Sequence, residues 1–169
     1  SKLDGSVVSA GGLAPVLALA LFFASCDVQK KGPSSSTNSP VDTSSAATCD
    51  DAILGLVNAY RRSVGKPAFE NDQVIWAQAN QHSRNMAAGT VAFGHDGFDA
   101  RVNAIRAAFG TTGAAAENLA MGYASAESLV NGWLGSAGHR ANIEGDASRT
   151  GISAVQSSAG VWYYTQIFY

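Results

Sequence analysis

Hydrophobic residues recur at helical intervals of three or four in two stretches that follow one another. The first stripe consists of Ile53, Val57, Tyr60 and Val64, and the second consists of Ile75, Ala79, His82 and Met86. Helices are therefore predicted over residues 50–64, before the stop signals Gly65 and Pro67, and over residues 72–88. Because His82 lies on the apolar stripe, we expect a core histidine that is hydrogen-bonded to a neighbour.

The remaining pattern predicts shorter helices and then a hairpin. The segments expected to be helical are residues 99–109, 126–135 and 138–143, and the expected strands are residues 150–157 and 161–168. In the first of these helices Arg101 and Arg106 are expected in solvent, and in the second Trp133 is expected in the core. The strands are rich in β-branched and aromatic residues and are joined by a glycine-containing turn. Helices followed by a terminal hairpin predict an α+β domain rather than a doubly wound sheet.

The first 48 residues differ in character from the rest of the chain. Residues 13–24 form an apolar run that is too short for a membrane span of about 20 residues but is typical of a secretory signal. The run leads into Phe-Ala-Ser-Cys, which resembles a bacterial lipobox and predicts lipidation of Cys26; the alternative is an unprocessed signal in which this cysteine has no special role. The chain is thus divided into a signal peptide (1–26), a disordered linker rich in serine, threonine and proline (27–48), and one folded domain (49–169).

Composition removes several function classes. The 169 residues carry a net charge of -2, so no basic footprint for nucleic acid is present and nucleic acid is not an expected partner. A hydrophobic share of 46% is enough for a core. The two cysteines, Cys26 and Cys49, are too few for a zinc ribbon or a disulfide framework. Acylation of Cys26 would leave Cys49 as a thiol or in an intermolecular bond; without acylation the two could pair.

Candidate chemistry is concentrated in two glycine-flanked histidines and one carboxylate. His95 lies in a predicted loop, His139 follows Gly138, and Glu117 lies midway between them in an alanine-rich setting that would raise its pKa and suit a general base. Two imidazoles and a carboxylate are the protein ligands of some catalytic zinc sites. No short two-ligand motif such as His-Glu-x-x-His is present, so the spacing alone favours unrelated polar residues. Ser136 near His139 lacks a Gly-x-Ser-x-Gly context, so a serine hydrolase is not expected.

Six ordered motifs resemble those of bacterial CAP domains, the superfamily of cysteine-rich secretory proteins, antigen 5 and pathogenesis-related 1 proteins. They are residues 58–61 (NAYR) with 64–67 (VGKP), 82–87 (HSRNMA), 93–95 (FGH), 117–120 (ENLA), 133–143 (WLGSAGHRANI) and 162–168 (WYYTQIF). The resemblance extends over residues 52–168. It implies a three-layer α-β-α sandwich with a small, mainly antiparallel sheet and an open cleft.

The resemblance also implies a set of site residues. In many eukaryotic members the cleft carries two histidines and two glutamates that can hold a divalent metal such as zinc. His95 matches the first histidine and Glu117 matches one glutamate, whereas Ser136 and Tyr163 stand at the other two positions. His139, from the bacterial Gly-His-Arg motif, is expected to supply an imidazole from another element. The predicted metal ligands are therefore His95, Glu117 and His139.

Three functions follow from these expectations. The first is an extracytoplasmic binding module, anchored to the membrane through a lipid on Cys26, whose His/Glu cleft captures a lipid, a peptide or a cell-envelope component. The second is a metal-dependent, peptidase-like hydrolase with a zinc-bound water among His95, Glu117 and His139. The third is a structural or host-interaction protein of the envelope. The incomplete ligand set favours the first and third over the second, and fold alone does not decide between them.

Overall fold

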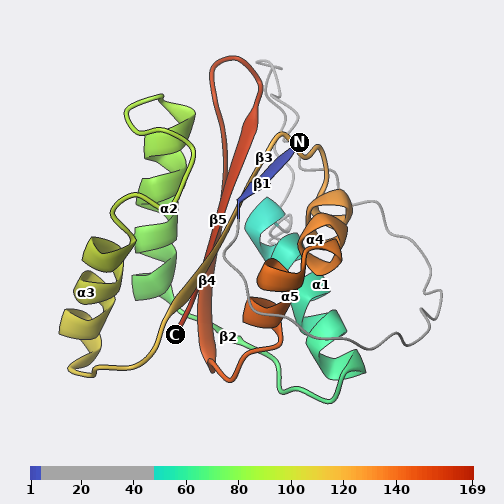
Figure 1. Cartoon of the computed structure of the whole chain (residues 1–169), viewed down its shortest axis with the longest axis vertical. Helices are drawn as coiled ribbons and strands as arrows, with labels where there is room; N and C mark the ends of the chain where they lie inside the picture. Colours follow the sequence, from blue (N-terminus) through green and yellow to red (C-terminus); the bar gives the residue numbers. More distant parts are fainter. Residues whose placement is uncertain (5–47) are drawn as a thin grey trace, which may run out of the picture.

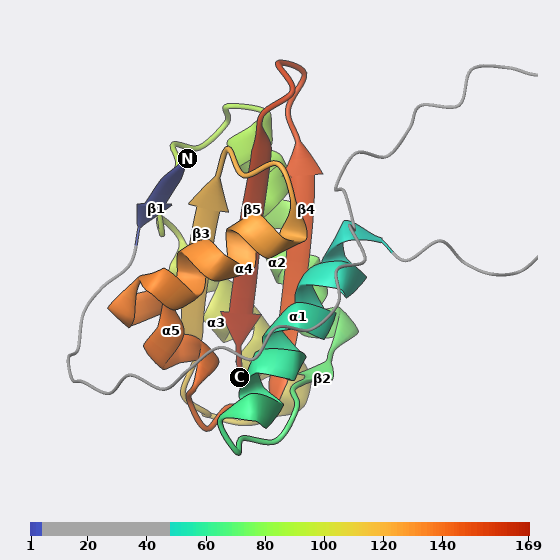
Figure 2. The ribbon, with the colours of Figure 1, turned by 90° about the vertical axis from the view of Figure 1, so that its right-hand side faces the viewer.

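A central sheet lies between two layers of helices in the computed structural model, which describes residues 1–4 and 48–169 (Figures 1 and 2). The helices are α1 Cys49–Ser63, α2 Gln73–Ala87, α3 Phe98–Phe109, α4 Ala126–Gly135 and α5 Ala137–Ile143. The strands are β1 Lys2–Asp4, β2 Glu70–Asn71, β3 Ala116–Met121, β4 Arg149–Gln156 and β5 Trp162–Phe168. Helices α2 and α3 cover one face of the sheet, and α1, α4 and α5 cover the other (Figure 1).

The sheet has the strand order β1-β3-β5-β4-β2, and only β2 and β4 pair in parallel. The predicted three-layer α-β-α sandwich with a mainly antiparallel sheet is therefore confirmed. The predicted terminal hairpin is also confirmed, because β4 and β5 pair from Thr150 and Phe168 to Gln156 and Trp162. Within the described residues, no helix has the length and apolar character that crossing a membrane requires.

The helices form where periodicity predicts them, and their ends are capped by short polar side chains. Thr48 forms a capping box with Asp51 at the start of α1, Asp72 accepts hydrogen bonds from the first turn of α2, and Ser125 caps α4. One residue of the first stripe was placed wrongly. Val64 lies beyond the end of α1 and is 46% exposed, whereas Arg61 is buried.

Strand β3 was not predicted from the sequence, although it carries Glu117. Its four central residues are all buried, so the strand lacks the polar and apolar alternation of a half-exposed strand. Alanine, glutamate and asparagine also have low β propensity. Its position is fixed by six residue pairs with β5, from Ala116 with Phe168 to Met121 with Tyr163.

Strand β1 pairs with the outer edge of β3, where Lys2 lies opposite Met121. It therefore covers part of an edge that would otherwise present unpaired backbone groups. Lys2–Asp4 belongs to the segment assigned above to a signal peptide, so cleavage at Cys26 would expose this part of β3. The remainder of that segment, the linker before Thr48, and Cys26 itself lie outside the described residues, and their assignments stay predictions.

Each face of the sheet supports its own core. Tyr164 and Phe168 pack with the cluster under α1 and α4, whereas Ile167, between them on β5, packs under α2 and α3. Trp133 is fully buried in the first cluster, and its indole N–H donates to Leu119 O at 3.3 Å. Trp133 is thus the core residue that the sequence predicted.

The start of α1 is tied to α2 and to β4 through Asp50. Asp50 accepts hydrogen bonds from Trp76 Nε1 on α2 at 2.9 Å and from the backbone N–H of Ala154 on β4 at 2.8 Å. The carboxylate of Asp50 therefore pairs with a backbone donor of β4 that lies beyond the short segment covered by β2. Burial raises the pKa of Asp50.

Cys49, next to Asp50, is disulfide-bonded. Its interpretation as a thiol is therefore wrong.

Candidate functional site

Four polar side chains from different elements meet on the face of the sheet that α2 and α3 cover. They are His82 on α2, His95 in the loop between α2 and α3, Arg101 on α3 and Glu117 on β3. Glu117 lies opposite Ile167 of β5, which belongs to the core under α2 and α3. We call these four residues the Arg101 cluster.

The centre of the cluster is a buried, bidentate ion pair. Arg101 Nε donates to Glu117 Oε2 at 2.8 Å, and Arg101 Nη2 donates to Glu117 Oε1 at 2.7 Å. The side chains are 10% and 1% exposed, respectively. Two parallel charge-assisted bonds match the planar fork of a guanidinium to a carboxylate. The carboxylate thus lies against a full positive charge, not in the apolar setting that its neighbours in the sequence suggest.

His95 adds a third donor to the same carboxylate. Its Nδ1 lies 2.9 Å from Glu117 Oε1, and its side chain is 33% exposed, so this imidazole connects the buried pair to the surface. The loop is positioned by Arg101, whose Nη1 donates to Asp96 O at 2.9 Å. Gly97 turns into α3 with φ of 78°, a conformation that favours glycine.

His82 is a neutral hydrogen-bonded core residue, as expected from its place on the apolar stripe. Burial lowers the pKa of His82, and the nearby positive charge of Arg101 lowers it further. Because a guanidinium can only donate, His82 Nδ1 accepts from Arg101 Nη1 at 3.1 Å. His82 Nε2 therefore carries the proton and donates to Gly94 O at 2.9 Å.

The expectation that Arg101 is solvated was wrong, and Arg101 is the functional residue that sequence reasoning missed. A lone arginine on a short helix is usually exposed. The sequence contained one indication that Arg101 is buried: it lies four residues before Ile105, on the same face of the helix, and Ile105 is buried. A second indication was Glu117 itself, a lone carboxylate in an alanine-rich segment, which would need a positively charged partner if buried.

His139 is not part of this cluster. Asn118 follows Glu117 in β3, so its side chain points to the opposite face of the sheet, where Asn118 Nδ2 donates to His139 O at 3.1 Å. His139 is 1% exposed, and its Nδ1 lies 2.7 Å from Ser136 Oγ. Ser136 is the N-cap of α5 and His139 is its third residue, so this bond joins two side chains within the first turn of the helix.

The predicted ligand set therefore does not fit a metal ion. The structure brings His95 and Glu117 together but separates both from His139 by the sheet. Within the described residues, no group of three or more histidine, cysteine, aspartate or glutamate side chains is arranged to hold a metal. Both oxygens of Glu117 already accept hydrogen bonds from Arg101. A hollow of about 70 Å³ beside His82 and Arg101 has room only for a few water molecules.

Structural relatives share this fold. An outer surface protein of Borrelia burgdorferi matches with a TM-score of 0.58 and 16% identity over 69% of this chain and 87% of its own. A cysteine-rich secretory protein of Staphylococcus aureus matches with a TM-score of 0.59 and 17% identity over 78% of this chain. An extracellular protein containing an SCP domain from Bacillus anthracis matches with a TM-score of 0.57 and 26% identity over 71% of this chain. This chain spans 40% and 39% of the last two proteins, respectively.

Sequence comparison gives the family. The chain has no match among curated proteins. The family model described as CAP, the cysteine-rich secretory protein family, matches residues 54–168, which include every helix and strand from α2 to β5. The match extends over more than half of the chain, and the structural relatives have the same fold. The chain therefore belongs to the CAP, or cysteine-rich secretory protein, family.

Proposed function

We propose that this CAP domain is an extracytoplasmic binding or interaction module rather than a metal-dependent hydrolase. The observation that supports this proposal is the pairing of Glu117 with Arg101. A carboxylate whose two oxygens accept bonds from a guanidinium is poorly suited to bind a metal or to take a proton from water. The hydrolase alternative also needs His139 beside His95 and Glu117, and the sheet lies between them.

Three observations support an extracytoplasmic location. Two relatives are described as an outer surface protein and an extracellular protein. Residues 1–26 have the pattern of a secretory signal. Cys49 is disulfide-bonded, and disulfides persist mainly in oxidising compartments. In this location, the partly exposed His95 imidazole is the part of the Arg101 cluster that can meet a peptide or cell-envelope ligand.

The first test of the proposal is metal content. We expect the purified chain to hold no stoichiometric zinc by elemental analysis and to give no 1:1 zinc isotherm by calorimetry, because Arg101 already neutralises Glu117. The variants Glu117→Gln and His95→Ala should give the same result as the wild type. One zinc per chain that both variants lose would contradict the proposal and favour the hydrolase.

A second test addresses the proposed lipid anchor on Cys26. One sulfur atom can carry either a lipid thioether or a disulfide, and Cys26 is the only cysteine besides Cys49. If the anchor is present, the Cys49 disulfide must join another molecule. We expect Cys26→Ser to move the chain from the membrane fraction to the soluble fraction, and the wild type to run as a disulfide-linked species on a non-reducing gel. A non-acylated monomer with an internal disulfide, by intact mass, would contradict the anchor.

A further inference from the structure

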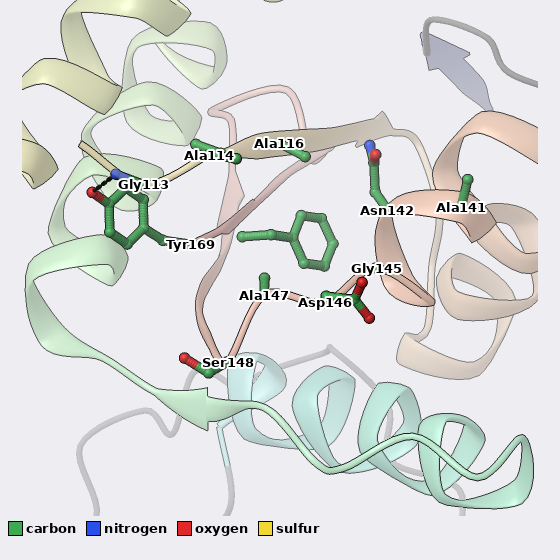
Figure 3. A pocket seen from close by; sticks show the side chains of 12 residues that line it. Gly113, Ala114, Ala116, Ala141, Asn142, Gly145, Asp146, Ala147, Ser148 and Tyr169 are labelled. Carbon is green, nitrogen blue, oxygen red and sulfur yellow. Dashed lines mark hydrogen bonds between the residues drawn. The ribbon is translucent and has the colours of Figure 1, made fainter. Parts of the chain in front are cut away.

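A pocket of about 430 Å³ opens at one end of the sheet, away from the Arg101 cluster. It lies between the segment that leads into β3 and the loop between α5 and β4 (Figure 3). Phe168, at the end of β5, is also part of its lining. Phe168 packs with the core under α1 and α4, and Tyr169 packs against the core under α2 and α3, so the pocket lies at the end of the sheet and shares no lining residue with the Arg101 cluster. Its side chains are small: five of its lining residues are Ala114, Ala115, Ala116, Ala141 and Ala147. We call it the alanine pocket.

One wall of the alanine pocket is fastened to α1. Arg61 is almost fully buried, and its Nη1 donates to the carbonyl oxygens of Ile143 and of Gly145, at 2.9 Å in the second case. Tyr60 donates to Glu144 in the same segment. The wall that begins at Gly145 is therefore held by side chains that lie behind it and do not fill the pocket.

The opposite wall is fastened at Gly113. The backbone N–H of Gly113 donates to the hydroxyl of Tyr169 at 2.9 Å, and its carbonyl accepts from Arg106 Nη2 at 3.0 Å (Figure 3). A β-carbon at this position would lie 2.9 Å from the tip of the Tyr169 ring, so a larger residue here would require that ring to shift. Two walls from distant parts of the sequence are thus held apart, and a pocket that is formed in advance reduces the entropic cost of binding.

The lining is chemically suited to an uncharged ligand with amide groups. Asp146 is the only charged side chain in the lining, and it is already paired with Lys66 at 2.9 Å; the hydrogen bond from Lys66 lowers the pKa of Asp146. Within the described residues, the backbone groups of Ala114, Ala115 and Ala147 form no hydrogen bond. Unpaired backbone donors and acceptors beside methyl groups can pair with an extended peptide that has small side chains.

We infer that the alanine pocket binds a short, extended, uncharged peptide segment with small side chains. Its volume lies within the range of roughly 300–1,000 Å³ that is usual for ligand pockets. The lining offers no positively charged side chain, and its one charge is the carboxylate of Asp146, so phosphate or carboxylate groups would be desolvated there without a partner. This inference rests on the proposed binding function and names a ligand class for it, at a site separate from the Arg101 cluster.

The test uses the capped tripeptide acetyl-Ala-Ala-Ala-amide, titrated into the full chain and followed by amide chemical shifts. We expect saturable shifts at residues 113–116 and 145–148. Two variants fill the pocket from its opposite walls, Ala114→Trp and Ala147→Trp, and each should weaken binding by roughly tenfold or more, about 1.4 kcal/mol. Ala104→Trp, at an exposed position on α3 outside the pocket, is the matched control and should bind as the wild type does. Ala114 is itself exposed, so its variant tests the pocket even if Ala147→Trp folds poorly.

Three results would overturn the inference. They are no saturable shifts with the tripeptide, equal binding by Ala114→Trp and the wild type, or occupation of the pocket by 1-octanol but not by the tripeptide, which would assign it to acyl chains instead. None of these results depends on the metal content of the chain. Zinc bound at His95 and Glu117 would refute the proposed function without affecting the pocket, and failure of tripeptide binding would leave the metal result unchanged.

Discussion

Replacing Arg101 with methionine is expected to lower the free energy of unfolding by about 3–5 kcal/mol, the usual cost of removing one partner of a buried ion pair. Methionine keeps much of the side-chain volume but removes every donor. Glu117, only 1% exposed, would then be a buried carboxylate with one remaining side-chain donor, His95. His82 Nδ1 and Asp96 O would also lose their hydrogen bonds. Urea unfolding followed by circular dichroism measures the difference.

The double variant Arg101→Met/Glu117→Gln distinguishes the contribution of the ion pair to stability from the contributions of the other contacts of the two side chains. Removing both charges abolishes the uncompensated charge, so the double variant should be more stable than the sum of the two single losses predicts. Arg84→Met is the matched control, because Arg84 is exposed on α2 and a change there should stay within about 0.5 kcal/mol. If Arg101→Met were as mild as Arg84→Met, the ion pair would not hold this site together.

The helices and the hairpin could be predicted because their signals are local. Apolar spacing placed α1 and α2, and the stop signals Gly65 and Pro67 follow the observed end of α1 at Ser63. Strand β3 could not be predicted because its residues are buried on both faces by distant elements, which removes the alternation that marks a strand. Its identity depends on pairing with β5, and pairing partners are not encoded in the segment itself.

The candidate site was predictable in its residue types but not in its arrangement. His95 and Glu117 were correctly expected to be neighbours. The side on which each residue lies, however, depends on the register of β3: Glu117 faces α3, and Asn118 faces α5. A strand that was not predicted gives no register, so His139 was placed beside Glu117 when it lies across the sheet. Because the register of β3 was unknown, the burial of Arg101 could not be predicted either. An arginine is expected in solvent unless a buried carboxylate is known to lie beside it.

Buried arginines have a similar role in both helical layers of this fold. Arg101 joins a loop to β3 through a carboxylate, and Arg61 joins α1 to the end of α5 through carbonyl groups. In each case the planar guanidinium satisfies several acceptors at once, which a lysine could not do in the same geometry. Arg61 also lies 3.7 Å from the centre of the Phe69 ring, a cation–π contact. The loops on both faces thus depend on one long side chain each.

Replacing Arg61 with methionine is therefore expected to lower the free energy of unfolding by about 3 kcal/mol or more. The carbonyls of Pro67, Ile143 and Gly145 would lose their donor, and each buried acceptor without a partner costs roughly 1–3 kcal/mol. Because Gly145 begins one wall of the alanine pocket and Ile143 lies just before it, amide hydrogen exchange should rise at residues 143–148. Arg62→Met, an exposed neighbour on α1, should change neither quantity. Unchanged exchange in Arg61→Met would show that the wall keeps its position without the guanidinium, and that the pocket is held open by other contacts.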